Sequence, residues 1–133
     1  MPICKRALVI DDAPLVARIL VETLEDESYE VRHASTGQDA LTLIEEWLPD
    51  VILLDLMLPV MDGWAFREAQ LKLATPARDV PVIVVSATRE FEVRTHELQA
   101  AAAISKPFDL DEVIATVDRV VCARMDGGLA NAR

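Results

Sequence analysis

The chain has 133 residues, a hydrophobic fraction of 52%, an aromatic fraction of 5% and a formal net charge of -10. Its length fits one domain with a mostly aliphatic core, and its acidity disfavours binding to nucleic acid or to an anionic membrane surface. Cys4 and Cys122 match no metal-binding spacing, and no long apolar run precedes Asp11 and Asp12. We therefore expect reduced thiols and a cytoplasmic protein without a signal peptide or membrane span.

Strand-like and helix-like segments alternate along the chain. In chain order, strands and helices are predicted in turn over residues 7–10, 14–27, 29–34, 36–47, 51–54, 62–73, 82–85, 90–98 and 102–104, with a last helix that begins at Asp109. Pro14 suits the first turn of a helix, and Thr36 with Asp39 resembles a capping box. The strand over 102–104 is predicted from its place between two helices, because four consecutive alanines favour a helix by propensity.

The last helix is expected to lose its order at Gly127 and Gly128. We therefore predict a domain over residues 1–124, followed by a flexible tail over residues 125–133.

This alternation predicts an α/β fold with a parallel sheet covered by helices on both faces. In such sheets the functional crevice lies at the carboxyl ends of the strands. Polar side chains follow four of the five predicted strands: Asp11 and Asp12, Asp55, Ser86 and Lys106.

The chemistry of these positions favours phosphoryl transfer. Carboxylates that converge on one rim repel each other, and a hard divalent cation such as Mg²⁺ relieves that conflict. Asp55 ends an apolar run that holds its backbone, so its carboxylate is placed to attack a phosphoryl group and form an aspartyl phosphate. Ser86 offers a hydroxyl donor to the phosphoryl oxygens, and Lys106 offers an ammonium group.

Several short motifs resemble the receiver domain of two-component response regulators. They are Asp11-Asp12, the run Asp-Leu-Met-Leu-Pro from Asp55, Met61-Asp62-Gly63, Ser86-Ala87 and Lys106-Pro107-Phe108. The resemblance covers about residues 5–124. It implies a CheY-like (flavodoxin-like) fold with five helices and a five-stranded parallel sheet in the order 2-1-3-4-5.

The resemblance also implies roles for single residues. Asp55 is the expected phosphoryl acceptor, and Asp12, Asp55 and the backbone carbonyl of Met57 are the expected Mg²⁺ ligands. Asp11 is expected to act through a metal-bound water, and Ser86 and Lys106 to bind the phosphoryl group. A cis peptide bond is expected before Pro107. The protein is then a switch with self-phosphorylation and self-dephosphorylation chemistry only, rather than an enzyme.

The implied partners are proteins. The donor is expected to be a sensor histidine kinase or a histidine phosphotransfer protein. On the first helix Val16, Ile19 and Leu20 are expected to face the sheet, which leaves Leu15 and Arg18 on the outer face as candidate docking residues. No helix-turn-helix, catalytic domain or basic patch follows Arg124. We therefore expect a stand-alone receiver that binds a downstream protein, or one whose output domain lies outside this sequence.

One position departs from the family pattern. Ala103 stands where the family usually has Tyr or Phe, three residues before the lysine. The surface change on phosphorylation is therefore expected to run through Ala87, Thr88 and Phe91.

Three other functions stay open at this stage. The chain fits an intermediate phosphoryl carrier in a phosphorelay. An aspartate-nucleophile phosphohydrolase fits less well, because it needs a second carboxylate at the position of Met57. A flavodoxin-like cofactor domain would need a Ser/Thr/Gly-rich phosphate loop, where this chain has Asp11-Asp12-Ala13-Pro14.

Overall fold

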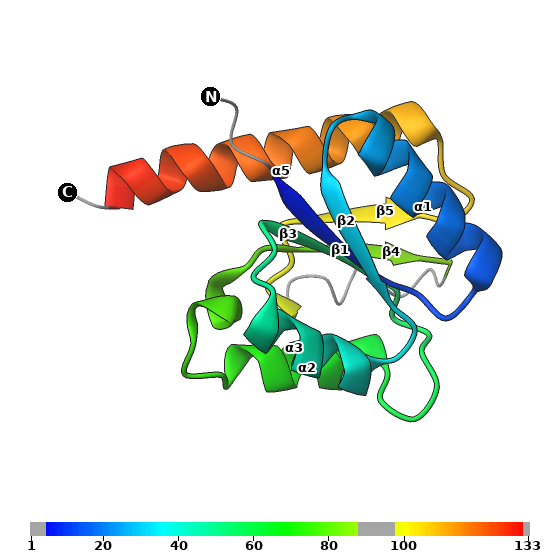
Figure 1. The fold of residues 1–133 in the computed structure, drawn as a ribbon, viewed down its shortest axis with the longest axis horizontal. Coiled ribbons are helices and arrows are strands. Elements are labelled where there is room, and N and C mark those ends of the chain that lie inside the picture. Colours follow the sequence, from blue (N-terminus) through cyan, green and yellow to red (C-terminus); the bar gives the residue numbers. More distant parts are fainter. Residues whose placement is uncertain (1–4, 88–97, 132–133) are drawn as a thin grey trace.

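The computed structural model describes residues 5–87 and 98–131, and its side chains through Arg124. Within these residues, five parallel strands form one sheet (Figure 1): β1 (Arg6–Ile10), β2 (Glu30–Ala34), β3 (Val51–Leu54), β4 (Val82–Ser86) and β5 (Ala102–Ser105). Their order is β2-β1-β3-β4-β5, which confirms the order that the resemblance implied. In the register Ile10 pairs with Leu54, Leu54 with Val84 and Val84 with Ala103, so the strands end close to one another along one edge.

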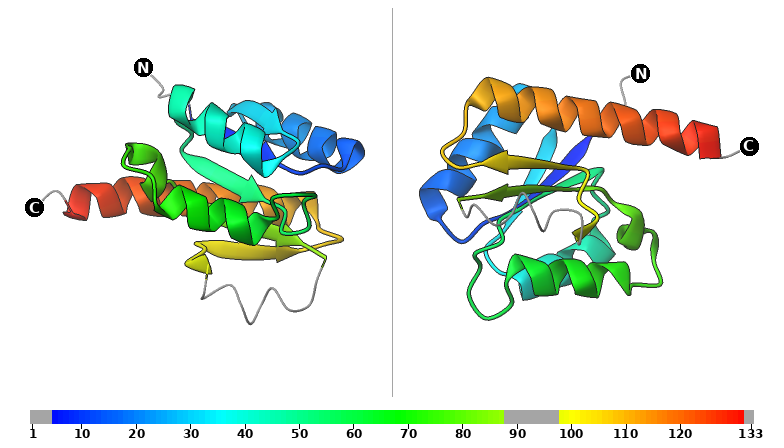
Figure 2. Two further views of the ribbon diagram at one scale, coloured as in Figure 1. Left: turned by 90° about the horizontal axis from the view of Figure 1, so that it is seen from below. Right: turned by 180° about the vertical axis from the view of Figure 1, so that it is seen from behind.

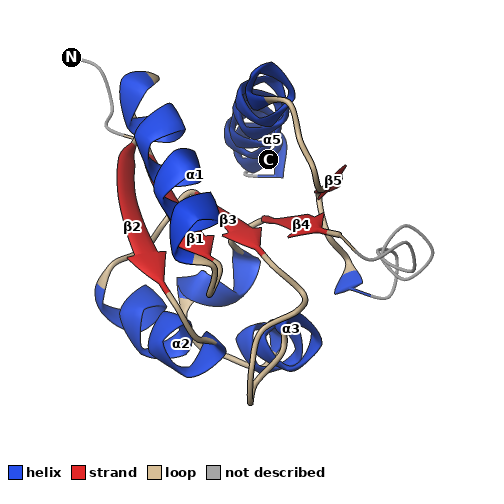
Figure 3. Ribbon diagram, turned by 90° about the vertical axis from the view of Figure 1, so that its right-hand side faces the viewer, coloured by secondary structure: helices blue, strands red, loops and turns tan. Residues whose placement is uncertain are grey.

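Helices cover both faces of this sheet (Figure 3). The helices α1 (Pro14–Asp26) and α5 (Leu110–Asn131) lie on one face, and α2 (Gly37–Glu46) and α3 (Gly63–Leu71) lie on the other. A short 3₁₀ helix, η1 (Pro76–Asp79), leads into β4. The predicted helix over residues 90–98 lies outside the described residues, apart from Leu98.

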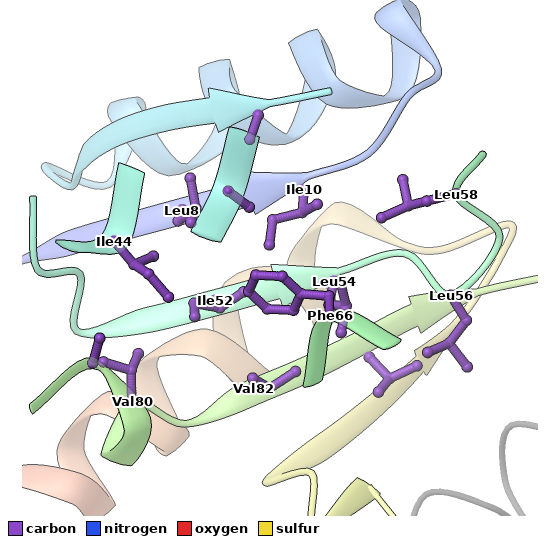
Figure 4. Close-up of a cluster of buried hydrophobic side chains, with 14 of the residues drawn as sticks. Leu8, Ile10, Ile44, Ile52, Leu54, Leu56, Leu58, Phe66, Val80 and Val82 are labelled. Atoms are coloured by element: carbon purple, nitrogen blue, oxygen red, sulfur yellow. The ribbon is translucent and has the colours of Figure 1, made fainter. Parts of the chain in front are cut away.

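The core consists of two apolar layers, one on each side of the sheet. Strand residues alternate between them, because successive side chains point to opposite faces. Leu8 and Ile10 belong to the layer under α2 and α3, in which Phe66 packs with the same faces of β3 and β4 (Figure 4). Ala7 and Val9 belong to the layer under α1 and α5. This burial on both faces explains why β3 reads as an unbroken apolar run.

Local hydrogen bonds set the ends of the helices. The Thr36 hydroxyl accepts from the Asp39 N–H at 3.0 Å, and the Asp62 carboxylate accepts from the Ala65 N–H at 2.9 Å. At the end of α1, Ser28 has a φ of 70°, and the N–H of Tyr29 donates back to the carbonyl of Leu24. That pattern is a Schellman motif with serine in the left-handed position.

The inward face of α1 differs from the prediction in one residue. Ala17, Leu20 and Leu24 are buried, whereas Ile19 is 45% exposed. At 3.6 residues per turn, Ile19 lies about 200° around the helix from Ala17, on the side away from the sheet. Ile19 therefore lies one turn beyond Leu15, which is 75% exposed, on the outer face.

The helix α5 continues past the glycine pair that was expected to end it. It spans 22 residues to Asn131, because two glycines lower helix propensity without stopping a helix. Whether residues 125–133 form a separate tail stays a prediction. Two contacts fasten the helix: the Tyr29 hydroxyl donates to Asp118 at 2.7 Å, and Arg124 donates to the carbonyls of Pro49 and Asp50. Its last turns project beyond the sheet (Figure 2).

A buried arginine on α3 joins three segments. Arg67 is 6% exposed and donates to the carbonyls of Leu98 and Gln99, at 2.8 and 2.9 Å, and to the side chain of Gln70 at 2.7 Å. Gln70 is fully buried and donates in turn to the carbonyls of Ala77 and Val80. Burial lowers the pKa of Arg67. The pair therefore ties α3 to the approach to β4 and to the residues before β5.

Among the described residues, none of the helices combines the length and the apolarity that crossing a membrane requires.

Candidate functional site

Acidic side chains meet at the carboxyl edge of the sheet. Asp11 and Asp12 follow β1, and Asp55 follows β3. One carboxylate oxygen of each lies within 4.8 Å of the others. Asp11 and Asp55 are buried, and Asp12 is exposed at the rim. The predicted carboxylates are thus together in space, because parallel strands bring residues that are distant in sequence to one edge.

Two hydrogen bonds orient the carboxylate of Asp55. Its Oδ1 accepts from the Met57 N–H at 3.0 Å, and its Oδ2 accepts from Lys106 Nζ at 3.4 Å. Burial raises the pKa of Asp55, and the negative charge of Asp11 adds to that rise. The Met57 N–H and the Lys106 charge act in the opposite direction without cancelling it. Any group that brings positive charge to this rim therefore favours the ionised, nucleophilic form.

Lys106 is the cation within this cluster. Its Nζ donates to Asp11 at 3.0 Å, and only 19% of its side chain is exposed. Burial disfavours its charge, but hydrogen bonds and charges from Asp11 and Asp55 outweigh burial, so the pKa of Lys106 is raised. The backbone N–H of Lys106 donates to the carbonyl of Ser86, and the bond to Pro107 is cis, as the resemblance implied.

The loop between β3 and α3 forms the outer wall of the site. Gly63 starts α3 so close to β3 that a Cβ there would lie 2.7 Å from both the Asp55 carbonyl and the Leu56 Cα. Val60 has a φ of 63°, and the N–H of Met61 donates across it to the Pro59 carbonyl at 2.7 Å. This is a γ-turn that a β-branched residue rarely adopts. The loop and Asp12 line a hollow of about 430 Å³.

The other predicted site residues lie around this edge. Ser86 is fully buried at the end of β4, with Ala87 directly after it. The Met57 side chain is 66% exposed, and Ala103 lies exposed on β5. Leu15 and Arg18 are exposed on α1, where Arg18 pairs with Glu22 at 3.1 Å. Thr88 and Phe91 lie outside the described residues.

The donor set fits Mg²⁺. The ligand atoms of the cluster are carboxylate oxygens, which a hard divalent cation prefers, and Asp12 is open to solvent. Lys106 is the cation that contacts these carboxylates among the described residues, so the described site keeps an excess of negative charge when all of its groups are ionised.

One residue beside this site was not predicted. His33 Nε2 lies 2.8 Å from the backbone carbonyl of Asp11. The sequence pattern of β2 marks His33 as one polar residue among several on an edge strand, so strand periodicity alone does not distinguish it.

Comparison with known proteins gives one family. The model of the response regulator receiver domain matches residues 7–118. The DNA-binding dual master transcriptional regulator RpaA of Synechocystis sp. is 32% identical over 123 residues, which cover 91% of this chain and 50% of that protein. The regulatory protein AtoC of Escherichia coli is 33% identical over 123 residues, which cover 91% of this chain and 26% of that protein.

Solved structures agree with the family match. The CheY-like response regulator receiver domain protein of Methanospirillum hungatei superposes with a TM-score of 0.85 at 27% identity, covering 94% of this chain and 99% of that one. This chain therefore spans half or less of the two curated relatives described above, and nearly all of the solved receiver domain.

Proposed function

Because the chain belongs to the family of response regulator receiver domains, we propose that it is a phosphorylation switch of two-component signal transduction that accepts a phosphoryl group on Asp55. The observation that carries the proposal is the placement of Asp55. Its buried carboxylate lies within 4.8 Å of two further aspartates and accepts a hydrogen bond from Lys106. A donor phosphohistidine on a sensor kinase or phosphotransfer protein is the proposed source of the phosphoryl group.

The proposed reaction is a displacement at phosphorus. A carboxylate oxygen of Asp55 forms the new P–O bond while the P–N bond of the phosphohistidine breaks, and the imidazole leaves with the bonding electron pair. Lys106 is placed to pair with a phosphoryl oxygen, and Ser86 to donate its hydroxyl to another. Attack requires Asp55 to be ionised, which the Met57 N–H and Lys106 promote.

Asp12, Asp55 and the carbonyl of Met57 are the groups proposed to hold Mg²⁺, with Asp11 acting through a water. When bound, the ion would neutralise charge that develops on the transferred oxygens. The carboxylates themselves provide the site.

Intact mass is the direct test of phosphoryl acceptance. Incubation of the purified protein with acetyl phosphate and Mg²⁺ is expected to add one phosphoryl group, and chelation of the metal is expected to prevent the addition. Absence of any mass gain under saturating donor would overturn the proposal. Turnover of a simple phosphate monoester, which is not an activated acyl phosphate, would favour the phosphohydrolase instead.

We also propose that the donor protein docks on the rim around this site. Large apolar side chains are exposed there on separate elements: Leu15 and Ile19 on α1, Met57 and Val60 before α3, and Leu110 at the start of α5. Single exposed apolar residues are common, but these lie in segments that follow the carboxyl ends of β1, β3 and β5, the edge at which the acidic cluster lies. Arg18 adds charge beside Leu15.

Leu15→Asp tests this docking. The change adds a negative charge on an exposed face, so folding and labelling by acetyl phosphate are expected to stay within twofold of the wild type. Transfer from a phosphorylated histidine phosphotransfer protein is expected to slow by about tenfold or more, the loss of roughly 1.4 kcal/mol of binding. Stopped-flow or rapid-quench transfer assays measure the effect. Thr23→Asp, on a half-buried flank of the same helix, is the charge control. Equal slowing with both donors would contradict docking.

The proposed output is a changed protein-binding surface. Ser86 and Ala87 lie at the end of β4, and β5 presents Ala103 to solvent where an aromatic side chain is absent. Any rearrangement therefore has to reach the surface through backbone movement after Ser86. Onward transfer to a second histidine, as in a phosphorelay, is the alternative output. We propose a cytoplasmic location, which suits a free, exposed thiol such as that of Cys122.

A further inference from the structure

The backbone between Asp11 and Asp12 is held from several sides. The Asp11 N–H donates to the Ala34 carbonyl at 3.2 Å, and its carboxylate accepts from the Ala13 N–H at 2.9 Å and from Lys106 at 3.0 Å. The carbonyl of Asp11 contacts His33 Nε2 at 2.8 Å. Each polar group of Asp11 thus has a partner, and the partner of the carbonyl is the side chain of an edge strand.

The direction of this last hydrogen bond follows from its chemistry. A backbone carbonyl can only accept, so Nε2 of His33 carries the hydrogen and donates it. His33 lies on β2 opposite Val9, two residues before Asp11, so its ring reaches forward past the end of β1. The interaction is therefore a side-chain clamp on the peptide that joins Asp11 to Asp12.

Orientation of that peptide decides where Asp12 lies. Asp12 is exposed at the rim, whereas Asp11 and Asp55 are fixed by burial. If the carbonyl of Asp11 were released, the peptide plane could rotate and carry the Asp12 carboxylate away from the other two. A ligand that needs all three carboxylates would then bind only to the part of the ensemble in which Asp12 is in place.

We propose that His33 is a positioning residue for the cation site, which it serves by fixing the Asp11–Asp12 peptide. This inference rests on the proposed function, because it concerns the Mg²⁺ that phosphoryl transfer to Asp55 would use. His33 is not one of the proposed ligands of the cation or of the phosphoryl group. Its contribution is to keep Asp12 ready to bind, so its loss should weaken Mg²⁺ binding without affecting the fold.

The effect of His33 on Mg²⁺ binding can be measured without disturbing the core of the domain. The residue is exposed and lines an open hollow of about 340 Å³ with Ser35, Asp39, Thr42 and Glu46. Replacement therefore removes no buried packing. Glutamine can place an amide N–H near the position of Nε2, whereas leucine of similar size has no donor.

The test compares Mg²⁺ binding by the wild type, His33→Leu and His33→Gln. MgCl₂ is titrated at one fixed pH, and the amide shifts of Asp12 and Asp55 are followed by NMR. His33→Leu is expected to raise the dissociation constant about fivefold, the scale of one partly exposed hydrogen bond. His33→Gln is expected to stay within about twofold. Melting temperatures without Mg²⁺ are expected to differ by no more than a few degrees, because only one exposed hydrogen bond is lost.

Thr42→Val is the matched control. Thr42 lines the same hollow, but its hydroxyl donates to the Gln38 carbonyl and does not reach Asp11. Its dissociation constant should equal that of the wild type. Equal Mg²⁺ affinity in the wild type and His33→Leu, or equal weakening by leucine and glutamine, would overturn the role of His33 and leave the proposed function standing. A wild type without any Mg²⁺-dependent shift would overturn both.

Discussion

Asp55→Asn is expected to abolish phosphoryl acceptance and, at the same time, to make the metal-free domain more stable. The amide keeps the size of the side chain but cannot act as the nucleophile, so the mass gain with acetyl phosphate should vanish. Stability should rise on the order of 1 kcal/mol, the scale on which single electrostatic changes at a buried site act, because the variant removes a buried charge beside Asp11. Urea unfolding without Mg²⁺ measures this.

The pH dependence of that difference has a definite sign. The pKa of Asp55 is raised in the folded protein, chiefly by burial, so the folded state binds the proton more tightly than the unfolded chain does. The contribution of Asp55 to stability therefore falls as pH rises from the ordinary aspartate pKa through the raised one. The advantage of the asparagine variant should grow across this window and stay constant above it.

Asp79→Asn serves as the control for Asp55. Asp79 is exposed on η1, far in sequence from the acidic cluster, and its carboxylate lies 4.0 Å from Arg78. It should be labelled like the wild type and should differ in stability by less than about 0.5 kcal/mol. Retained stoichiometric labelling of Asp55→Asn would show that another residue accepts the phosphoryl group.

Arg67→Met is expected to destabilise the domain by about 3 kcal/mol, because buried acceptors lose their charged donor. Methionine fills similar space but cannot donate to the carbonyls of Leu98 and Gln99 or to Gln70. Removal of the cost of burying the guanidinium acts in the opposite direction. It does not prevail, since a single partner is removed and the acceptors remain in place. In a domain of this size, the melting temperature should fall by roughly 10 °C.

Arg78→Met is the matched control for Arg67. It makes the same chemical change on η1, where the Arg78 side chain is 56% exposed, and it should leave stability within about 0.5 kcal/mol. A melting temperature of Arg67→Met equal to that of Arg78→Met would contradict the account of the buried network. Because Arg67 donates to none of the residues of the acidic cluster, residual labelling at low temperature should persist in the folded fraction.

The site residues at the strand ends could be predicted from the sequence. Each is marked by a short apolar run just before it, and the parallel sheet brings the ends of these runs together. Asp11, Asp55 and Lys106 each follow an apolar run, and parallel pairing brings the ends of such runs to one edge. The strand that contains Ala102 and Ala103 was predicted against its alanine propensity. Pairing with β4 overrides that preference, since Ala103 lies opposite Val84 in the sheet.

Side chains that act across elements could not be predicted in this way. In the sequence, Arg67 resembles an ordinary charged residue on the solvent-exposed face of a helix. Only its spacing of three residues from Gln70 indicates that the two side chains share a buried face. His33 donates to the carbonyl of Asp11, which follows a different strand, and the spacing of apolar residues cannot predict such a contact. Ile19 was wrongly predicted to face the sheet. The apolar residues of α1 spread over a broad arc of the helix, and the buried centre of that arc is Ala17, whose small side chain indicates burial only weakly.

The helix α5 has a mechanical consequence. Its fastenings at Asp118 and Arg124 are six residues apart, about 9 Å along the axis, and Asn131 lies about 10 Å farther out. Where this helix moves as one body, it acts as a lever between these points. By simple proportion, a sideways shift of 1 Å at Arg124 about a pivot at Asp118 would move the backbone at Asn131 by about 2 Å. Small adjustments where β3 begins would thus be doubled at the far end of the molecule.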